Sequence, residues 1–324
     1  MRRILLLAPG LALASAALAN DSTASSAAGG LILQRTDAID MVSEDLFVSA
    51  KEIRVSYVFR NRTPRDVETV VAFPMPDHDL SQDYGQDRAY PSGFRTRVAG
   101  QPVKTRIERR AVLKGKDYTA LLRQYGIPLL DGPTSVMDRL PAANQKRLVS
   151  LGLAGDEEYD DTGKGMKHHL IPLWTVKETH YWTQRFPAGR DLAVDHRYVP
   201  GRGGSVDTIL NSPYVEKSDP ERRAYIARYC IDREFLAGVQ RMRRTNQVLP
   251  NTWIDYILTT GANWRSPIGS FRLVIDKGRP QNLISFCESG VKKIGPTQYE
   301  VRHKNWRPTR DLHVLIIHPG AWEM

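Results

Sequence analysis

The chain has 324 residues, of which 41% are hydrophobic, 25% charged and 8% aromatic. This length allows one large domain or two ordinary domains with a substantial core. The composition excludes a coiled coil, a collagen, a disordered tail and a polytopic membrane protein. Lys and Arg outnumber Asp and Glu by 46 to 36, so the net charge is +10 and the protein is a basic globular one.

The first nineteen residues have the pattern of a secretory signal peptide. They begin with two arginines, continue with an apolar segment and end on the small-x-small motif Ala17-Leu18-Ala19. The apolar segment is too short for a membrane-spanning helix, and Pro9 and Gly10 interrupt it. We therefore expect a periplasmic or secreted protein, cleaved between Ala19 and Asn20 and without a transmembrane anchor.

Cleavage at this point would remove two arginines and no acidic residue, so the net charge would fall from +10 to +8. A basic exported protein is attracted to anionic envelope components, such as phospholipid head groups, lipopolysaccharide or acidic polysaccharide. Charge alone does not select among these partners, and it also serves solubility.

Alternating strands dominate the first half of the mature chain. Residues 53–59 alternate apolar and polar side chains, and residues 67–73 form a returning strand after a turn. A second pair of alternating segments, 94–98 and 103–107, flanks Gly100. Each pair is predicted to form a hairpin.

A helical insertion near residues 117–152 interrupts these strands, because apolar side chains there recur at the helical spacing. An acidic segment, residues 156–161, follows. Its five carboxylates could bind Ca²⁺, but they lack the alternating spacing of an EF-hand loop, so a solvated loop is favoured. Strands resume over 174–186 and 192–198, and Gly201 to Gly204 resembles a linker.

The last third begins with a predicted helix near residues 219–245, which starts at the capping sequence Ser218-Asp219-Pro220-Glu221. Strands follow over residues 253–260, 271–276, 283–287, 299–304 and 312–318. The absence of βαβ alternation argues against a parallel α/β enzyme fold. The prediction is therefore a mainly β protein with two β-sandwich-like modules. Residues 20–204 carry the short helical insertion, and residues 205–324 carry one packed α-helix.

The chain contains two cysteines, Cys230 and Cys287. In an oxidising compartment they allow a single connectivity. The alternative is a free catalytic thiol, but no His motif flanks either residue. We therefore expect a Cys230–Cys287 disulfide that ties the C-terminal helix to its sheet.

Three segments carry a resemblance to a known family: NDSTASSAAGGLIL, then SEDLFVSAKEIRVSYVFRN with DVETVVAFPMP, and LTTGANWRSPIGSFRLVIDKG with NLISFCESGVKKIGPTQYE. Together they resemble the bacterial exported family domain of unknown function 4424, over nearly the whole mature chain. That resemblance implies export and brings no known catalytic residues. Residues 43–200 also resemble a vault/inter-alpha-trypsin domain, a β-sandwich associated with adhesion, in the "RN" turn, the "AFPMP" strand end and the "VAGQPV" hairpin.

The sequence lacks the familiar catalytic signatures. It has no G-x-S-x-G, H-E-x-x-H, C-x-x-C or P-loop motif and no dinucleotide fingerprint. We therefore assign no catalytic residue and no cofactor. We expect a non-enzymatic envelope protein that binds a protein partner, an anionic polysaccharide or a lipid head group through sheet surfaces and loops.

A basic stripe is the candidate for anion binding. Arg95, Arg97, Lys104 and Arg106 would share one face of the second predicted hairpin. The alternative is the solvated face of an amphipathic hairpin. Nucleic acid is not an expected partner, because the compartment is wrong and no aromatic platform lies among these cations.

Two further alternatives remain open. If a three-residue loop at 187–189 joins its flanking strands, Glu178, His180 and His196 share one sheet face and form a potential zinc or iron site. The alternative function is therefore a metal-dependent enzyme or a metal-binding protein. A one-residue slip in register would abolish that arrangement. Secondly, Trp253, Trp264, Trp306 and Trp322 could stack on sugars, although core packing is the more common role for tryptophan at strand ends.

Overall fold

The computed structural model describes residues 21–320, except 28–29, 83–89, 161–162, 164, 212–215 and 217. The predicted signal peptide and its cleavage site lie outside the described residues. No helix within them is long and apolar enough to span a membrane.

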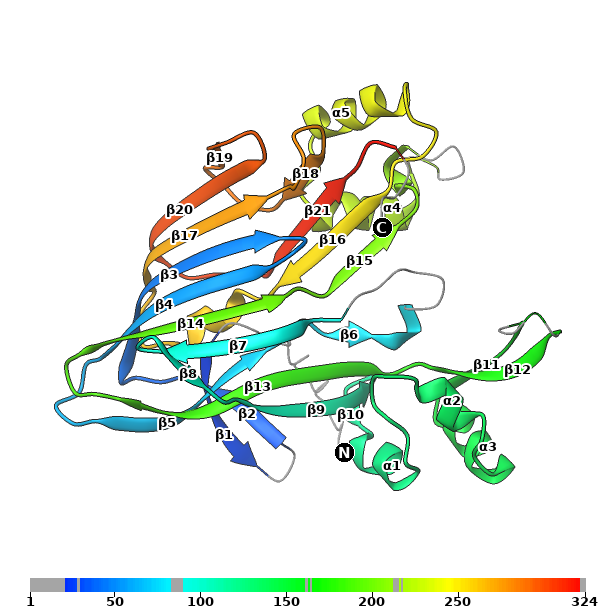
Figure 1. Cartoon of the computed structure of the whole chain (residues 1–324), viewed down its shortest axis with the longest axis horizontal. Helices are drawn as coiled ribbons and strands as arrows, with labels where there is room; N and C mark the ends of the chain where they lie inside the picture. The colour runs from blue at the N-terminus through cyan, green and yellow to red at the C-terminus, as the bar shows by residue number, and fades with distance from the viewer. Residues whose placement is uncertain are drawn as a thin grey trace, which may run out of the picture.

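One eight-stranded sheet, here called the shared sheet, runs through the whole molecule (Figure 1). Every pairing within it is antiparallel except that between its third and fourth strands, which is parallel. Across the sheet the strands follow in the order β19 (Lys292–Lys293), β20 (Gln298–Trp306), β17 (Ile268–Asp276), β3 (Ile39–Ser49), β4 (Ile53–Asn61), β14 (Asp191–Val199), β7 (Ser92–Val98) and β8 (Gln101–Val103).

Two smaller sheets form the second layer. The N-terminal sheet has the order β10 (Lys116–Asp117), β9 (Arg106–Leu113), β13 (Thr175–Phe186), β5 (Val67–Pro74), β1 (Ser22–Ala27) and β2 (Gly30–Gln34), and β6 (His78–Asp79) also pairs with β13. The C-terminal sheet has the order β15 (Arg202–Ser205), β16 (Asn251–Tyr256), β21 (Leu312–Ile317) and β18 (Leu283–Phe286).

Both smaller sheets pack against the same face of the shared sheet. Tyr57 and Phe59 lie two residues apart on β4 and therefore point to one side. The ring of Phe59 meets Phe186 of the N-terminal sheet edge to face at 5.9 Å, and the Tyr57 hydroxyl lies 3.0 Å from that of Tyr256 in the C-terminal sheet. One continuous hydrophobic core thus joins all three sheets.

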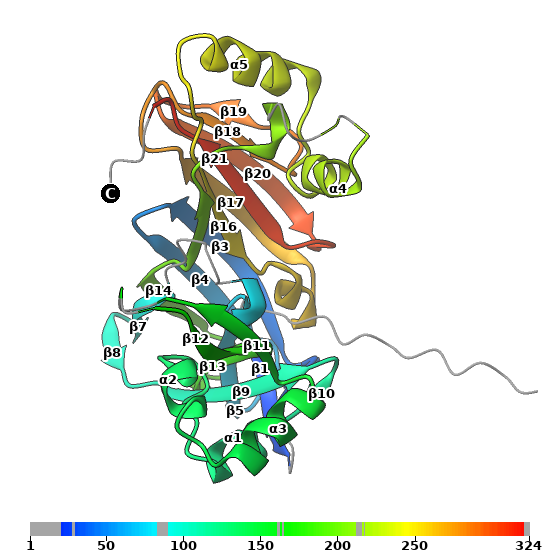
Figure 2. The ribbon, with the colours of Figure 1, turned by 90° about the vertical axis from the view of Figure 1, so that its right-hand side faces the viewer.

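Helices cover the outer faces of the second layer at opposite ends of the molecule (Figures 1 and 2). On the C-terminal sheet, α4 (Pro220–Arg228) and α5 (Arg233–Arg243) enclose a core of their own, with η2 (Ile209–Asn211) beside them. On the N-terminal sheet, α1 (Thr119–Gln124), α2 (Pro133–Met137), α3 (Ala142–Ser150) and η1 (Leu80–Gln82) enclose another core with the hairpin of β11 (Ala154–Tyr159) and β12 (Lys167–Pro172). The remaining 3₁₀ helix is η3 (Thr259–Asn263).

The predicted fold class is confirmed: the chain is mainly β and builds sandwich-like modules. The shared sheet contains strands from both sides of residue 204, because β17 lies beside β3. The division into residues 20–204 and 205–324 stays a prediction.

Two predicted hairpins are wrong in their pairing, and a third is confirmed in part. The strand β4 belongs to the shared sheet while β5 belongs to the N-terminal sheet, and β14 and β13 are separated in the same way. The hairpin around Gly100 does form between β7 and β8, with Thr96 opposite Val103, but the chain then leaves the shared sheet and β9 joins the N-terminal sheet. At each of these places the chain crosses between layers. Alternation shows which face of a strand is buried but does not identify its partner, so the sequence could not distinguish a hairpin from a crossover.

Two local expectations also change. The predicted helix over 219–245 is divided into α4 and α5, because Cys230 adopts a left-handed conformation (φ 51°) and the Asp232 carboxylate caps α5 by accepting from the Phe235 N–H at 2.7 Å. The acidic segment 156–161 is not simply a loop, since residues 156–159 form most of β11 and pair with β12.

The parallel pairing of β3 with β17 is held closely. Gly269 begins it, and a Cβ at this position would lie 2.6 Å from the Val42 carbonyl oxygen, so only glycine allows the strands to approach there. The Arg272 guanidinium then donates to Asp45 on β3 at 3.1–3.2 Å and to Glu300 on β20 at 2.7 Å. The ion pairs therefore link three neighbouring strands.

The Glu300 carboxylate gives this linkage a pH dependence. Hydrogen bonds from Arg302 and Arg272 lower the pKa of Glu300 from 4.5 to about 2. Because the folded-state pKa is the lower one, the carboxylate stabilises the fold above about pH 5, and this contribution is lost as the pH falls toward about 2. Glu300→Gln should therefore reduce the free energy of unfolding, measured in urea, by more at pH 6 than at pH 3.

The control for this measurement is Glu234→Gln, which replaces an exposed carboxylate on α5. That variant should track the wild type at both pH values. An equal effect of Glu300→Gln at pH 6 and pH 3 would contradict the assignment.

Candidate functional site

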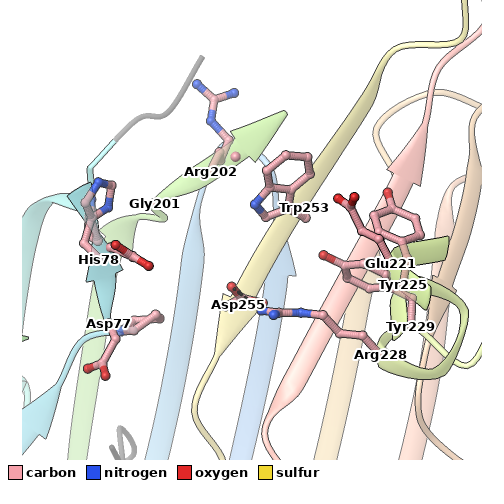
Figure 3. A pocket seen from close by; sticks show the side chains of 14 residues that line it. Asp77, His78, Gly201, Arg202, Glu221, Tyr225, Arg228, Tyr229, Trp253 and Asp255 are labelled. Carbon is pink, nitrogen blue, oxygen red and sulfur yellow. Dashed lines mark hydrogen bonds and ion pairs between the residues drawn. The ribbon is translucent and has the colours of Figure 1, made fainter. Parts of the chain in front are cut away.

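Two neighbouring clefts have Arg202 in common. The first, here called the inter-sheet cleft, has a volume of about 590 Å³ and lies between β6 and α4 (Figure 3). It is lined by Pro76, Asp77, His78, Asp79, Pro91, Gly201, Arg202, Gly203, Glu221, Tyr225, Arg228, Tyr229, Trp253 and Asp255.

The middle of the inter-sheet cleft is formed by Trp253, a half-buried residue of β16. Its partner in the register is Gly203 on β15. A Cβ at position 203 would lie 2.0 Å from the indole Nε1, so the indole lies directly across the β15 backbone and glycine is required beneath it. The sequence predicted a linker at residues 201–204, but these residues contribute to the edge strand β15. A glycine-rich composition is common to both, so it could not distinguish them.

A charged network forms the wall of the inter-sheet cleft next to Trp253. Arg228, at the end of α4, donates to both oxygens of Asp255 at 3.1–3.2 Å, as Figure 3 shows. The Nδ1 atom of His313 lies 2.6 Å from Asp255 Oδ1. Burial alone would raise the pKa of Asp255, but hydrogen bonding to His313 and the nearby Arg228 charge outweigh it and lower that pKa. The carboxylate is therefore ionised at neutral pH.

The predicted disulfide is confirmed and holds this wall in place. Cys230 and Cys287 are bonded, with their Cα atoms 5.1 Å apart. Cys230 follows directly after Arg228 and Tyr229, and the Ser285 hydroxyl of β18 donates to the Tyr229 carbonyl at 2.8 Å. The bond thus fastens the end of α4, with its cleft-lining side chains, to the C-terminal sheet.

Removing this bond should weaken the C-terminal sheet. A disulfide that closes a loop with a sequence separation of 57 stabilises the fold by about 4 kcal/mol in the chain-entropy model. We expect the double variant Cys230→Ser with Cys287→Ser to lower the free energy of unfolding by up to about 4 kcal/mol. Wild-type protein reduced with dithiothreitol should lose the same stability. Urea denaturation measures both, and an unchanged midpoint would refute the structural role.

The second cleft, here called the basic cleft, has a volume of about 1090 Å³. It lies at the common end of several strands of the shared sheet, beside the first residues of β16 and the last residues of β21. Its charged lining residues are the cations Lys51, Arg95, Arg197, Arg202, Lys277 and Arg279 and the anions Glu52 and Asp276. Arg202 lines both clefts.

The charges of the basic cleft are not balanced. Glu52 is already engaged by Arg197 at 2.6 Å and by Arg54 at 3.2 Å. Lys277 is buried and donates to the carbonyls of Pro280 and Asn282 at 2.7 and 2.6 Å. Burial, together with the nearby Lys293 charge, lowers the pKa of Lys277. The exposed arginines of the rim therefore provide most of the excess positive charge.

Two buried polar atoms at the basic cleft lack a hydrogen-bond partner within the described part of the chain. They are the hydroxyl of Tyr198, which is 2% exposed, and the Oδ1 atom of Asn282, which is 3% exposed. Both residues line the cleft. A buried polar atom without a partner costs stability, so these two atoms are the polar groups of the cleft that a bound molecule could satisfy.

The predicted basic stripe is only partly brought together. Arg95, Arg97, Lys104 and Arg106 are all exposed, but Arg106 lies on β9 in the N-terminal sheet, away from β7. Only Arg95 lines the basic cleft, where it pairs in register with Arg197 on β14. Sequence reasoning missed the other cations of the cleft because the pairing of the strands that brings them together was not predicted. They are Lys51, Arg197, Arg202, Lys277 and Arg279.

The predicted metal ligands occupy different sheets. His180 lies on β13 and His196 on β14, and these strands do not pair. Phe94 lies against both imidazoles, with ring centroids 4.1 and 5.1 Å away. Glu178 binds Arg109 at 2.5 Å and His180 at 3.1 Å.

His196 is instead part of a buried polar pair. Its Nε2 atom lies 3.1 Å from both carboxylate oxygens of Asp21, and its Nδ1 atom lies 3.0 Å from the Thr96 hydroxyl. Among the residues that the structure describes, no three His, Cys, Asp or Glu side chains form a group able to hold a metal ion.

The tryptophans divide by role. Trp264 is fully buried and donates to the Asp21 carbonyl at 2.7 Å, and Trp306 packs on Phe271 at 4.4 Å. Trp322 lies outside the described residues. Of the four, Trp253 is the one that lines a cleft described here.

A solved structure of the "putative nutrient binding protein" from Legionella pneumophila aligns with a TM-score of 0.48 and 15% identity, over 93% of this chain and 70% of that one. The sequence matches no curated protein. The model of the family described as domain of unknown function (DUF4424) matches residues 19–315, so this chain belongs to that family.

Proposed function

We propose that this protein is an exported, non-enzymatic binding protein whose basic cleft holds an anionic group of an envelope component. One observation carries the proposal: a cavity of about 1090 Å³ is lined by six cations and two anions and contains the unpartnered Tyr198 hydroxyl. A hydroxyl can donate to an anion, and the guanidinium groups of Arg95, Arg197 and Arg202 suit phosphate, sulfate or carboxylate oxygens.

The electrostatics support an anion rather than a neutral molecule at this place. A cleft lined mainly by one sign of charge concentrates the field and attracts counter-charged ligands over several ångströms. Arg95 and Arg197 are exposed, and Arg197, which pairs with Glu52, has further N–H donors on its guanidinium. Of the predicted basic stripe, the proposed anion site therefore includes Arg95 alone, together with Arg197 and Arg202 from other strands.

Mutation of the rim should distinguish the cleft from general surface charge. We expect Arg95→Ala with Arg197→Ala to weaken binding of polyphosphate and of a sulfated oligosaccharide by about tenfold or more, since each charge-assisted hydrogen bond contributes about 1.5–3 kcal/mol. Isothermal titration calorimetry at low salt measures the affinities, and added salt should weaken the wild type.

The matched control is Arg97→Ala with Arg106→Ala, which removes the same charge from two exposed positions that do not line the cleft. This control should retain most of the affinity. Equal losses in both double variants, or no binding by the wild type, would refute the cleft as the anion site.

The location of the protein remains part of this proposal. The signal-like residues 1–19 and the disulfide both support export to an oxidising compartment. The resemblance of residues 43–200 to a vault/inter-alpha-trypsin domain agrees with a binding role and also stays a prediction.

Processing can be measured directly on protein purified from cells. We expect intact-mass and N-terminal peptide analysis to find Asn20 as the first residue, because the small-x-small motif ends at Ala19. A purified protein that still begins with Met1 would contradict cleavage.

A further inference from the structure

We propose that the ligand is an acidic saccharide. In this arrangement one sugar ring stacks on Trp253 in the inter-sheet cleft, and an acidic substituent occupies the basic cleft. The inference rests on the proposed anion-binding function and adds the chemical class of the rest of the ligand.

The two clefts adjoin each other. Arg202 lines both, while its neighbours divide between them: Gly201 and Gly203 line the inter-sheet cleft and Val199 lines the basic cleft. The segment from Val199 to Gly203 is therefore the common border. A single extended ligand that crosses this border would contact the same arginine from both sides.

Trp253 supplies a flat apolar surface at the inter-sheet cleft. Its indole lies across the β15 backbone at Gly203, and the part of the ring that is not buried lines the cleft. A large, rigid aromatic side chain offers contact area at little cost in conformational entropy. The apolar face of a sugar ring suits such a surface.

The polar groups around Trp253 suit hydroxyls. Arg228 and Asp255 pair with each other, yet the guanidinium has five N–H donors. Oδ1 of Asp255 contacts both Arg228 and His313, whereas Oδ2 contacts Arg228 at 3.1 Å and has a second lone pair. Hydroxyl groups both donate and accept, so they can bind a carboxylate and a guanidinium side by side. Glu221 adds a further exposed carboxylate at the same wall.

The same groups oppose the other anionic candidates. A polyphosphate chain entering this cleft would meet the carboxylates of Asp79, Glu221 and Asp255 and has no apolar face for the indole. A lipid tail would remove water from Arg228 and Asp255 without replacing their hydrogen bonds. A neutral sugar ring in the inter-sheet cleft avoids both costs when the acidic substituent of the ligand lies in the basic cleft.

In the basic cleft, Asn282 also favours a ligand with hydroxyl groups. Its buried Oδ1 atom can only accept a hydrogen bond, and no described residue donates to it. An ionised phosphate, sulfate or carboxylate oxygen cannot satisfy it. A hydroxyl next to an acidic substituent can, while the anion itself accepts from Tyr198 and the arginines.

The test compares four probes by isothermal titration calorimetry: a xylo-oligosaccharide that carries one glucuronate substituent, the same xylo-oligosaccharide without it, polyphosphate, and vesicles containing anionic phospholipid. The wild type should bind the glucuronate-bearing oligosaccharide more tightly than the other three. Trp253→Ala should weaken binding of that oligosaccharide by about tenfold, the size typical of a buried tryptophan contact, and leave polyphosphate binding unchanged.

Two further variants complete the design. Gly203→Ala keeps the indole but displaces it, because the new Cβ would collide with Nε1, and it should cause the same selective loss even if Trp253→Ala folds poorly. Trp306→Ala removes a tryptophan that packs on Phe271 away from both clefts and should not alter affinity. Thermal denaturation verifies that each variant is folded.

The possible failures are distinct. If Trp253→Ala and Gly203→Ala both retain the affinity for the glucuronate-bearing oligosaccharide, or if vesicles or polyphosphate bind more tightly than this saccharide, the saccharide inference is overturned while the anion site stands. If Arg95→Ala with Arg197→Ala affects none of the probes, the proposed function fails and the inference fails with it.

Discussion

The parallel pairing of β3 with β17 is the constraint on which the remaining architecture depends. It joins a strand from the first sixth of the described chain to one from the last sixth, over seven consecutive register pairs from Ser43–Ser270 to Ser49–Asp276. Parallel neighbours need a long crossover, and here residues 50–267 supply it. The pairing leaves little tolerance, because Gly269 approaches the Val42 carbonyl and Arg272 must reach both Asp45 and Glu300.

A sheet of this width has an inner face that no single partner sheet covers. The N-terminal and C-terminal sheets therefore share it, and buried polar contacts fix where each one lies. The Tyr57–Tyr256 hydroxyl pair links the shared sheet to the C-terminal sheet, and the Asp21–His196 pair links it to β1. Burial raises the pKa of Asp21 although His196 opposes the shift. Such groups add little net stability but are satisfied in one arrangement only.

Much of the secondary structure could be predicted from the sequence, because strand alternation and helix capping are local. Residues 53–59 alternate as predicted and bury Ile53, Val55, Tyr57 and Phe59. The pairing of Cys230 with Cys287 followed from there being two cysteines. The conformation of Cys230, which ends α4, could not be predicted because a positive φ at a non-glycine residue depends on tertiary contacts.

The strand partners could not be predicted, and the site depended on them. His180 and His196 lie on consecutive strands of the chain, yet His180 belongs to the N-terminal sheet and His196 to the shared sheet. The ring of Phe94 lies against both imidazoles. Arg95 and Arg197 are about a hundred residues apart in sequence and become neighbours because β14 lies between β4 and β7. A pattern of period two has no information about such long-range order.

Because the basic cleft lies at the strand ends of the shared sheet, it draws residues from both sides of the β3–β17 pairing. Arg95 and Arg197 belong to the strands on the β4 side, whereas Lys277 and Arg279 follow β17. The ligand proposed for this cleft would contact both sets, so it would bind the joined sheet alone and add RT ln(1 + [L]/Kd) to the stability of that pairing. Separation of the two halves would remove the cleft and release the ligand. The proposed binding would thus be thermodynamically linked to the parallel pairing, although no ligand contact to β3 itself is required.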